Sequence, residues 1–408
     1  MVRLPARLKP LFPYLKPMYV QATRMVAPTS QFLSGRRGGH LPTGVVPTLA
    51  ESAVSTGGRY EQARPAERVQ RPPMQGEPAD MPLTDPSDGQ SFAAIGVAEL
   101  PGGRVLGPHH AVITGTGDLV QGVSWYFGTT RPREHPVFLN PFPPAPLQVD
   151  GRLGVLAARG DGNYYHYLMD VIGKLGVLEQ TPSIPEPERW YASVSGPPFQ
   201  KQLLELAGIP VDAVVDAVDH PHVSADVLVV PAPPAMSETN PPWAVQWLRD
   251  RLLPRVDLSG PRQRIYVTRG ASANNRTVLN DDDVTGLLES RGFVLVDPGT
   301  MTVAEQIRVF ATADIIVATH GAALANLVFA SPGATLIELF PQGCLLPDYW
   351  RLASGIPGLG YRYLTAHGKP PRRGRAAAIV RDIQVDVPAL ERMLDELDAT
   401  TPLHRTQS

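Results

Sequence analysis

The sequence has little cysteine and no long apolar run. Cys344 is its single cysteine, which excludes an internal disulfide framework and is typical of a reducing compartment. No segment approaches the roughly 20 apolar residues that a membrane-spanning helix needs. Prolines also interrupt the N-terminal stretch where a signal peptide would require an apolar core, at positions 5, 10, 13 and 17. We therefore expect a cytoplasmic protein.

Charge and glycine spacing exclude two further classes. The net charge of −2 over 408 residues gives no general attraction to nucleic acid. The G-x-G-x-x-G fingerprint is absent at the ends of the predicted strands, which disfavours a Rossmann oxidoreductase. Seven basic residues precede Glu51, the first acidic one. This N-terminal arm has two open interpretations, a disordered tail and peripheral contact with an anionic membrane.

Composition and periodicity divide the chain into four parts. Residues 51–90 are rich in Pro, Gly, Ser, Gln and Glu, so we expect residues 1–90 to be a basic arm and a disordered linker. Alternating strands and helices predict an α/β domain over residues 91–254. Four strands with three crossover helices predict a parallel, Rossmann-like sheet over 255–375, with ligands at the carboxyl ends of its strands. Residues 376–408 contain one more predicted helix.

The first candidate site is the loop after a predicted strand at residues 315–318. His320, Gly321 and Ala322 run directly into a predicted helix at residues 322–329. The unpaired N–H groups and the dipole at a helix start favour a phosphate, and Gly321 permits close approach of the backbone. A tight turn in which Gly321 serves geometry alone is the alternative.

A second loop, after the predicted strand at residues 265–268, is rich in arginine and asparagine. Arg269 and Arg276 at one strand end favour forked recognition of a diphosphate, and a solvated surface loop is the alternative. Asp281, Asp282 and Asp283 satisfy the D-x-D pattern of metal-dependent sugar transferases. They also open a predicted helix, where carboxylates are favoured by capping and by the dipole, and we prefer that interpretation.

Two histidine pairs lack the partners that a metal site requires. His109 and His110 adjoin one another, and His220 and His222 flank a proline, without a matching carboxylate or cysteine cluster. We expect exposed loop histidines at these positions and no metal site.

The third candidate site begins a predicted helix at residues 164–179. Asn163, His166 and Asp170 fall at helical spacing and share one face. Apolar neighbours surround Asp170, an environment that suits a general base. A capping or core role is the alternative for each residue taken alone, but the three together favour a functional face.

These constellations, in this order, resemble the family 61 glycosyltransferases, and within them the bacterial branch of capsular polysaccharide synthesis. Asn163, His166 and Asp170 are similar to the family's N-terminal motif. The similarity covers about residues 150–345. Its C-terminal block contains these residues: Arg269, Arg276, Asn280, Phe293, Glu305, Gln306, Phe310, Ala313, His320, Gly321, Ala322, Asn326, Phe329 and Glu338.

The resemblance implies an α/β fold of two Rossmann-like domains that face one another across a cleft, the GT-B type. It implies inversion at the anomeric carbon without an obligatory metal or other cofactor. The donor would be a nucleotide-sugar, first of all a UDP-sugar, and the acceptor a glycan or lipid-linked hydroxyl. The C-terminal helix would pack back on the first domain.

The resemblance also assigns roles to residues. Asp170 would be the base, with His166 as its partner or rival. Donor contacts would come from Asn163, Arg269, Arg276, Asn280, His320, Gly321, Ala322 and Asn326, and from Glu338, which would accept hydrogen bonds from ribose. A non-catalytic nucleotide-sugar or glycan-binding module on the same fold is the alternative, and the intact Asn163, His166 and Asp170 set argues against it.

Overall fold

The computed structural model describes residues 40–83, 90–126, 131–139, 143–235, 239–269, 277–366 and 381–400. The chain forms two compact units, each assembled from two separate segments. Unit 1 comprises Met1–Pro65 and Ala94–Pro233, and unit 2 comprises Ala66–Ala93 and Pro234–Ser408. The N-terminal arm up to residue 39, and the predicted diphosphate residue Arg276, lie outside the described residues.

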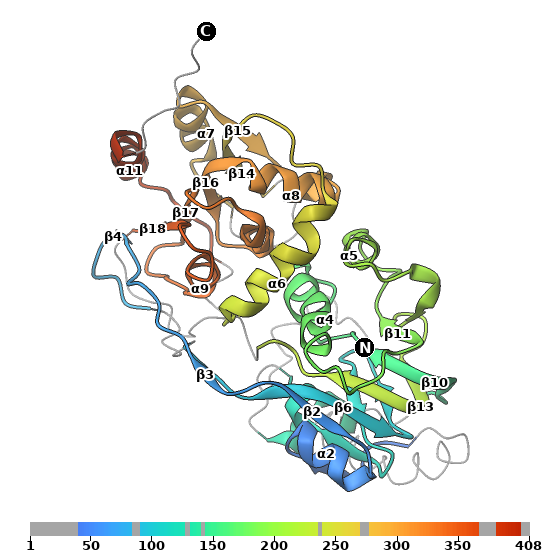
Figure 1. Cartoon of the computed structure of the whole chain (residues 1–408). Helices are drawn as coiled ribbons and strands as arrows, with labels where there is room; N and C mark the ends of the chain where they lie inside the picture. Colours follow the sequence, from blue (N-terminus) through green and yellow to red (C-terminus); the bar gives the residue numbers. More distant parts are fainter. Residues whose placement is uncertain are drawn as a thin grey trace, which may run out of the picture. The chain divides into compact units, whose positions relative to one another are not determined.

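Unit 1 is built on a ten-stranded mixed sheet (Figure 1). Its parallel part runs in the order β13-β10-β11-β12, and antiparallel β6 and β7 pair with β13. The sequence predicted strands at β10, β11 and β13, but it predicted neither β12 nor how far antiparallel pairing extends the sheet. The strands are β1 (Gly44–Val46), β2 (Tyr60–Arg64), β6 (Ile95–Pro101), β7 (Arg104–Leu106), β8 (Ala111–Ile113), β9 (Asp118–Val120), β10 (Leu147–Val155), β11 (Arg189–Ala192), β12 (Val214–Asp216) and β13 (His222–Pro231).

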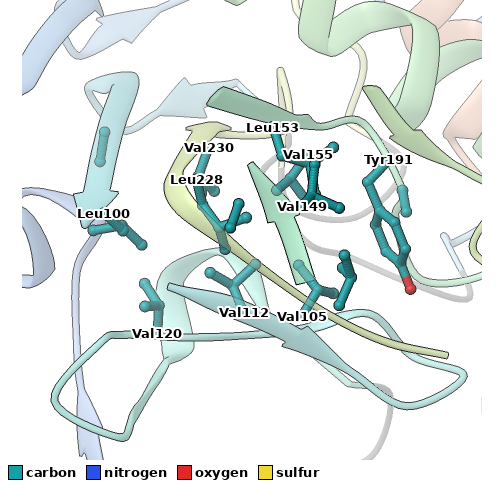
Figure 2. Close-up of a cluster of buried hydrophobic side chains, with 14 of the residues drawn as sticks. Leu100, Val105, Val112, Val120, Val149, Leu153, Val155, Tyr191, Leu228 and Val230 are labelled. Carbon is teal, nitrogen blue, oxygen red and sulfur yellow. The ribbon is translucent and has the colours of Figure 1, made fainter. Parts of the chain in front are cut away.

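The core of unit 1 is formed by buried apolar side chains from several of these strands. Val105 and Val112 come from β7 and β8, and Val149, Tyr191 and Leu228 come from β10, β11 and β13 (Figure 2). All five side chains are almost completely buried. Burial of this kind stabilises a fold by about 1.5–3 kcal/mol for each large apolar side chain, so the core fixes the ends of β10 and β11.

One helix of unit 1 carries the predicted catalytic face. It begins as α3 (Tyr164–His166), widens into the π-helical turn η5 (Tyr167–Ile172) and continues as α4 (Gly173–Leu178). This agrees with the predicted helix at residues 164–179. The next helix, α5 (Phe199–Ala207), ends at Gly208, whose φ of 86° lies in the left-handed region that glycine tolerates.

Unit 2 contains a six-stranded, entirely parallel sheet, as the sequence predicted for its main strands. The strand order is β15 (Phe293–Val296), β14 (Gln263–Val267), β16 (Ala313–Thr319), β17 (Thr335–Leu339), β18 (Gly360–Leu364) and β4 (Gly76–Glu77). The helices around it are α6 (Pro242–Leu252), α7 (Asp281–Ser290), α8 (Val303–Ala311), η9 (Ala322–Phe329), α9 (Asp348–Ala353) and α11 (Val387–Thr400). Thr302 and Glu305 form the predicted capping box of α8.

The predicted linker is largely structured. Residues 49–77 contain α2 (Leu49–Thr56), β2 and β4, and β3 (Glu67–Arg68) pairs with β5 (Ser91–Phe92). The linker prediction rested on a low apolar content, but β2 and β4 gain their hydrogen bonds from the distant strands β6 and β18. Backbone pairing with strands that are distant in the sequence therefore orders a segment whose composition alone predicted disorder.

Two assignments to the first domain also differ from the structure. Helix α6, which the predicted boundary at residue 254 placed in the first domain, belongs to unit 2. Helix α11 packs against α7, and its Leu390 and Met393 join the core of unit 2 rather than that of the first domain (Figure 1). An amphipathic pattern predicts that a helix buries one face, but it does not identify the surface that receives it.

Candidate functional site

His166 and Asp170 form a hydrogen-bonded pair on the helix of unit 1 that begins at Tyr164. The His166 Nδ1 atom lies 2.8 Å from Asp170 Oδ2, and the two side chains are 14% and 22% exposed. The widened turn η5 begins directly after His166 and contains Asp170. Turns of this kind occur frequently at functional sites. The pair predicted from helical spacing is therefore present, and solvent reaches both members.

Two loop residues set the start of this helix. Asn163 caps it, because its Oδ1 atom accepts a hydrogen bond from Tyr165 N at 2.9 Å. The structure thus gives Asn163 a capping contact, whereas its predicted donor contact stays a prediction. Gly160 has a φ of 82°, and a Cβ atom there would lie 3.1 Å from His166 Cδ2. The loop backbone consequently supports the imidazole ring at close range.

A second carboxylate, Asp161, lies in the same loop and was not predicted. Its Oδ2 atom lies 3.0 Å from His110 Nε2 and accepts a hydrogen bond of 2.6 Å from Ser193 Oγ. Burial raises the pKa of Asp161, but His110, Ser193 and the positive charge of Lys174 outweigh that effect and hold it below its ordinary value. A lone aspartate in a Gly-Asp-Gly loop after a strand was the available sequence signal.

Two of the histidines predicted to be exposed are buried instead. His110 is 5% exposed, because its ring is drawn to Asp161, and its φ of 51° is unusual for a residue other than glycine. His222 is 2% exposed, and its Nδ1 atom lies 2.6 Å from Pro144 O. Burial lowers the pKa of His222 to about 4. The spacing of residues in a sequence can indicate a cluster of metal ligands. It cannot indicate that a histidine is buried against a single carboxylate, as His110 is, or a single carbonyl group, as His222 is.

Lys174 was also missed, although it lies one helical turn after Asp170. Its Nζ atom donates to Val155 O at 3.3 Å and Ala157 O at 2.8 Å, at the carboxyl end of β10. Burial lowers the pKa of Lys174 to about 8, while the charges of Asp170 and Asp161 act in the opposite direction. An isolated lysine within an apolar helix was its sequence signal.

In unit 2, His320 lies among acidic and aromatic side chains at the carboxyl end of β16. Its Nδ1 atom is 2.7 Å from Glu338 Oε1, and its Nε2 atom is 3.6 Å from Asp348 Oδ2. The rings of Phe340 and Tyr349 pack beside the imidazole. This environment fixes the ring, so the predicted phosphate turn starts from a rigid residue.

The contacts of Glu338 differ from the predicted contact with a ribose hydroxyl. Its side chain is completely buried, with one oxygen on His320 and the other accepting a hydrogen bond of 2.7 Å from Tyr361. Burial raises the pKa of Glu338, while His320 and Tyr361 oppose the rise. Both oxygens are engaged inside the protein, so the arrangement is one that orients His320 and not one that reaches a ribose hydroxyl.

Arg269 approaches the glycine of the predicted phosphate turn. Its Nη1 atom donates to His320 O at 3.2 Å, and a Cβ atom at Gly321 would lie 3.2 Å from the same nitrogen. The predicted helix at residues 322–329 is present, as a 3-10 helix. Its first N–H groups nevertheless lack partners within the helix, as at any helix start. Arg269, Gly321 and Ala322 are thus brought together as predicted.

The remaining predicted donor residues make internal contacts. Asn326 is buried and donates to Gln306 Oε1 at 2.9 Å and Ala323 O at 3.0 Å. Asn280 donates to Val385 O and accepts from Val385 N, both at 3.0 Å. These side chains hold η9 to α8, and the C-terminal segment to unit 2. A contact with the donor remains a prediction for both.

The three successive aspartates occupy the first turn of α7, as the capping interpretation predicts. Asp281 also accepts a hydrogen bond of 2.8 Å from Tyr266.

Within the described ranges, no group of three or more His, Cys, Asp or Glu side chains is arranged to hold a metal ion. Across those same ranges, the helices are too short or too polar to span a bilayer.

Comparison with known proteins finds a family resemblance over the central part of the chain. Residues 164–337 match the sequence profile of the family described as Glycosyltransferase 61. This region of the chain is therefore similar to the glycosyltransferase 61 domain. The matched region contains both the His166–Asp170 pair and the His320–Gly321 turn. Asn163 and Glu338 lie one residue beyond its two ends.

Curated relatives in vertebrates are similar to part of this chain. They carry the name Protein O-linked-mannose beta-1,4-N-acetylglucosaminyltransferase 2. The Mus musculus protein is 31% identical over 107 residues, which is 24% of this chain and 18% of the relative. The Homo sapiens protein is 28% identical over 112 residues, which is 26% of this chain and 19% of the relative. The Tetraodon nigroviridis protein is 26% identical over 111 residues, which is also 26% of this chain and 19% of the relative. The matches thus span about a fifth of each relative.

Proposed function

We propose that this protein is an inverting glycosyltransferase that moves a sugar from a nucleotide-sugar donor to a hydroxyl group of a glycan or lipid-linked acceptor. The donor that we propose is a UDP-sugar. The observation that carries the proposal is the partly exposed His166–Asp170 pair, joined at 2.8 Å within the family domain. A carboxylate hydrogen-bonded to an imidazole is suited to accept a proton from an acceptor hydroxyl.

In the proposed reaction the acceptor oxygen attacks the anomeric carbon from the face opposite the leaving group. The bond between that carbon and the diphosphate oxygen breaks, and the hydroxyl proton passes to Asp170, directly or through His166. Arg269 and the N–H groups at the start of η9 would stabilise the negative charge on the leaving diphosphate, where other transferases use a metal. His320, oriented by Glu338, would hold this turn in place.

The finer parts of the proposal concern architecture and biological setting. A GT-B arrangement, in which the two units face across a cleft, would bring acceptor and donor sites together. We propose a role in cell-surface polysaccharide synthesis, with the basic N-terminal arm giving peripheral contact with the inner face of the membrane. The names of the relatives state transfer to O-linked mannose, so acceptor panels should include mannosides beside lipid-linked glycans.

Nucleotide release with a panel of UDP-, GDP- and CMP-sugars tests the activity, and the Asp170→Asn variant tests the base. Loss of a general base typically lowers rates by about 10²–10⁴-fold, so we expect near-complete loss of turnover with donor affinity retained. Asp212→Asn, at an exposed position in unit 1, is the matched control. Full turnover by Asp170→Asn would show that the base is misassigned.

The same assay separates the proposal from its alternatives. Turnover that survives EDTA would support the metal-independent mechanism, and turnover that requires an added divalent cation would contradict it. Donor binding without transfer or hydrolysis, for any donor and acceptor, would instead support a non-catalytic binding module.

A further inference from the structure

Lys174 is a buried cation next to the proposed base. The side chain is 3% exposed, and its ammonium group donates to the carbonyl groups of Val155 and Ala157. Removing an ammonium group from water costs several kcal/mol unless other charges compensate. An apolar side chain would attach a helix to a strand at lower cost. The presence of a lysine here therefore needs an explanation beyond packing.

The position of Lys174 connects the three parts of the proposed catalytic centre. It follows Asp170 by one helical turn, so its charge and that of Asp170 interact. It also interacts with Asp161, and its acceptor Ala157 lies just before the loop whose Gly160 supports the His166 ring. The ammonium group of Lys174 thus interacts electrostatically with Asp170 and Asp161. It also anchors the chain just before the loop that supports His166.

We propose that Lys174 is a positioning residue for the His166–Asp170 pair: it holds the helix that begins at Tyr164 on the end of β10, and its positive charge balances Asp161 and Asp170 from inside the protein. The kinetic consequence rests on the proposed glycosyltransferase function, whereas the electrostatic consequence at His166 does not. Lys174 itself touches no reacting atom.

Other charged groups near this helix are paired elsewhere. On the strands that pack against α4, Glu99 of β6 pairs with Arg152 and Arg59, and Arg64 of β2 donates to Gln180. Asp226 of β13 accepts from Gly151 N, and Glu61 of β2 accepts from Ser183. On α5, Lys201 lies 3.9 Å from Glu205. The electrostatic partners of Lys174 are accordingly Asp170 and Asp161.

Two variants separate a charge effect from a tether effect. Lys174→Met removes both the charge and the donors, while Lys174→Gln retains an N–H donor for the carbonyl of Ala157 without the charge. Removing a positive charge makes proton uptake by the neighbouring pair easier. We expect both variants to move the acidic limb of the pH–kcat profile to higher pH, because loss of a nearby positive charge favours the protonated form of a carboxylate. We also expect kcat to fall at least about tenfold while donor KM changes little.

An NMR titration of the His166 ring gives a second readout that needs no activity. In the full-length protein with labelled histidine, the His166 signal is assigned by its disappearance in His166→Gln. The titration midpoint should rise in Lys174→Met and Lys174→Gln by the same amount as the kinetic limb. Lys201→Met, which removes an exposed lysine of the same unit, should leave both readouts at wild-type values.

The outcomes distinguish this inference from the proposed function. A Lys174→Gln protein with a wild-type pH profile and a wild-type His166 titration would overturn the charge role, even if Lys174→Met does not fold. Absence of turnover by the wild-type protein with every donor would overturn the proposed function. The His166 titration would still decide the role of Lys174 in that case.

Discussion

At the scale of the residue, a buried lysine makes stability depend on pH in a defined direction. Lys174 has a pKa of about 8 in the folded protein, below the ordinary 10.5, because burial disfavours its charge. Between these values the unfolded chain binds more protons than the folded protein, so the contribution of this group to stability rises with pH. Below pH 8 the full cost of the buried charge is present.

The wild-type protein should therefore gain stability relative to Lys174→Met as the pH rises. Between pH 7.5 and 10 we expect the difference in unfolding free energy to move toward the wild type by up to about 3 kcal/mol, since each pKa unit corresponds to about 1.4 kcal/mol. Urea unfolding at a series of pH values measures this difference. A difference that stays constant across the range would contradict the folded-state pKa of Lys174.

Single residues were predicted well where their role is local in sequence. His166 and Asp170 could be paired from helical spacing, and their hydrogen bond is present. Glu338 was given a ribose contact because Tyr361, which donates a hydrogen bond to it, lies on β18, a strand for which the sequence predicted nothing. Asn280 likewise bonds to Val385, 105 residues away. Partners at that separation are set by tertiary structure and leave no periodic pattern.

At the scale of the element, the loop before the helix that begins at Tyr164 should tolerate an alanine substitution at Gly162 but not at Gly160. Gly160→Ala would place a Cβ atom 3.1 Å from the His166 ring and force alanine into a left-handed conformation. That conformation costs about 1–2 kcal/mol for residues other than glycine. We expect a loss of stability of this size and at least a tenfold lower kcat, because the ring must move.

Gly162→Ala provides the matched control in the same loop. A Cβ atom at Gly162 meets no atom within 4 Å, so this variant should retain wild-type stability and kcat. Thermal unfolding and steady-state kinetics compare the two. Equal behaviour of Gly160→Ala and Gly162→Ala would mean that the loop does not position His166.

Amphipathic helices were the elements most accessible from sequence. Helix α5 ends at Gly208 and α8 begins with its capping box, both as predicted. The segment at residues 322–329 was predicted as a helix without a type. It is a 3-10 helix whose residues from Leu324 to Phe329 are all buried, so no polar face marks its periodicity. Strands β1 and β4 have three and two residues and were missed, because such lengths carry no alternation that a sequence can reveal.

At the scale of the whole molecule, the two units have separate cores, and a change in one core should be felt mainly in its own unit. Leu390 of α11 is completely buried in the core of unit 2. Leu390→Ala should destabilise this unit by about 2–5 kcal/mol. Hydrogen exchange followed by mass spectrometry should then show faster exchange in peptides of unit 2, and wild-type exchange in the peptide that contains α3 and η5.

Leu258→Ala, at a position that is 38% exposed in unit 2, is the control and should leave exchange unchanged. Faster exchange across the α3 and η5 peptide in Leu390→Ala would instead mean that α11 supports the first domain, as the family resemblance had implied. The sequence predicted this helix but not its destination, since several apolar faces in the chain could have received it.

The division of each unit into two segments has a consequence for synthesis on the ribosome. The chain passes between units at residues 65/66, 93/94 and 233/234, so unit 1 is complete in sequence once Pro233 has emerged. Strand β4 belongs to unit 2 and pairs with β18, which is translated nearly 300 residues later. At roughly 5–20 residues per second, β4 waits about 15–60 s for its partner. The helix that begins at Tyr164 can thus fold first, while the parallel sheet of unit 2 closes only when translation is nearly finished.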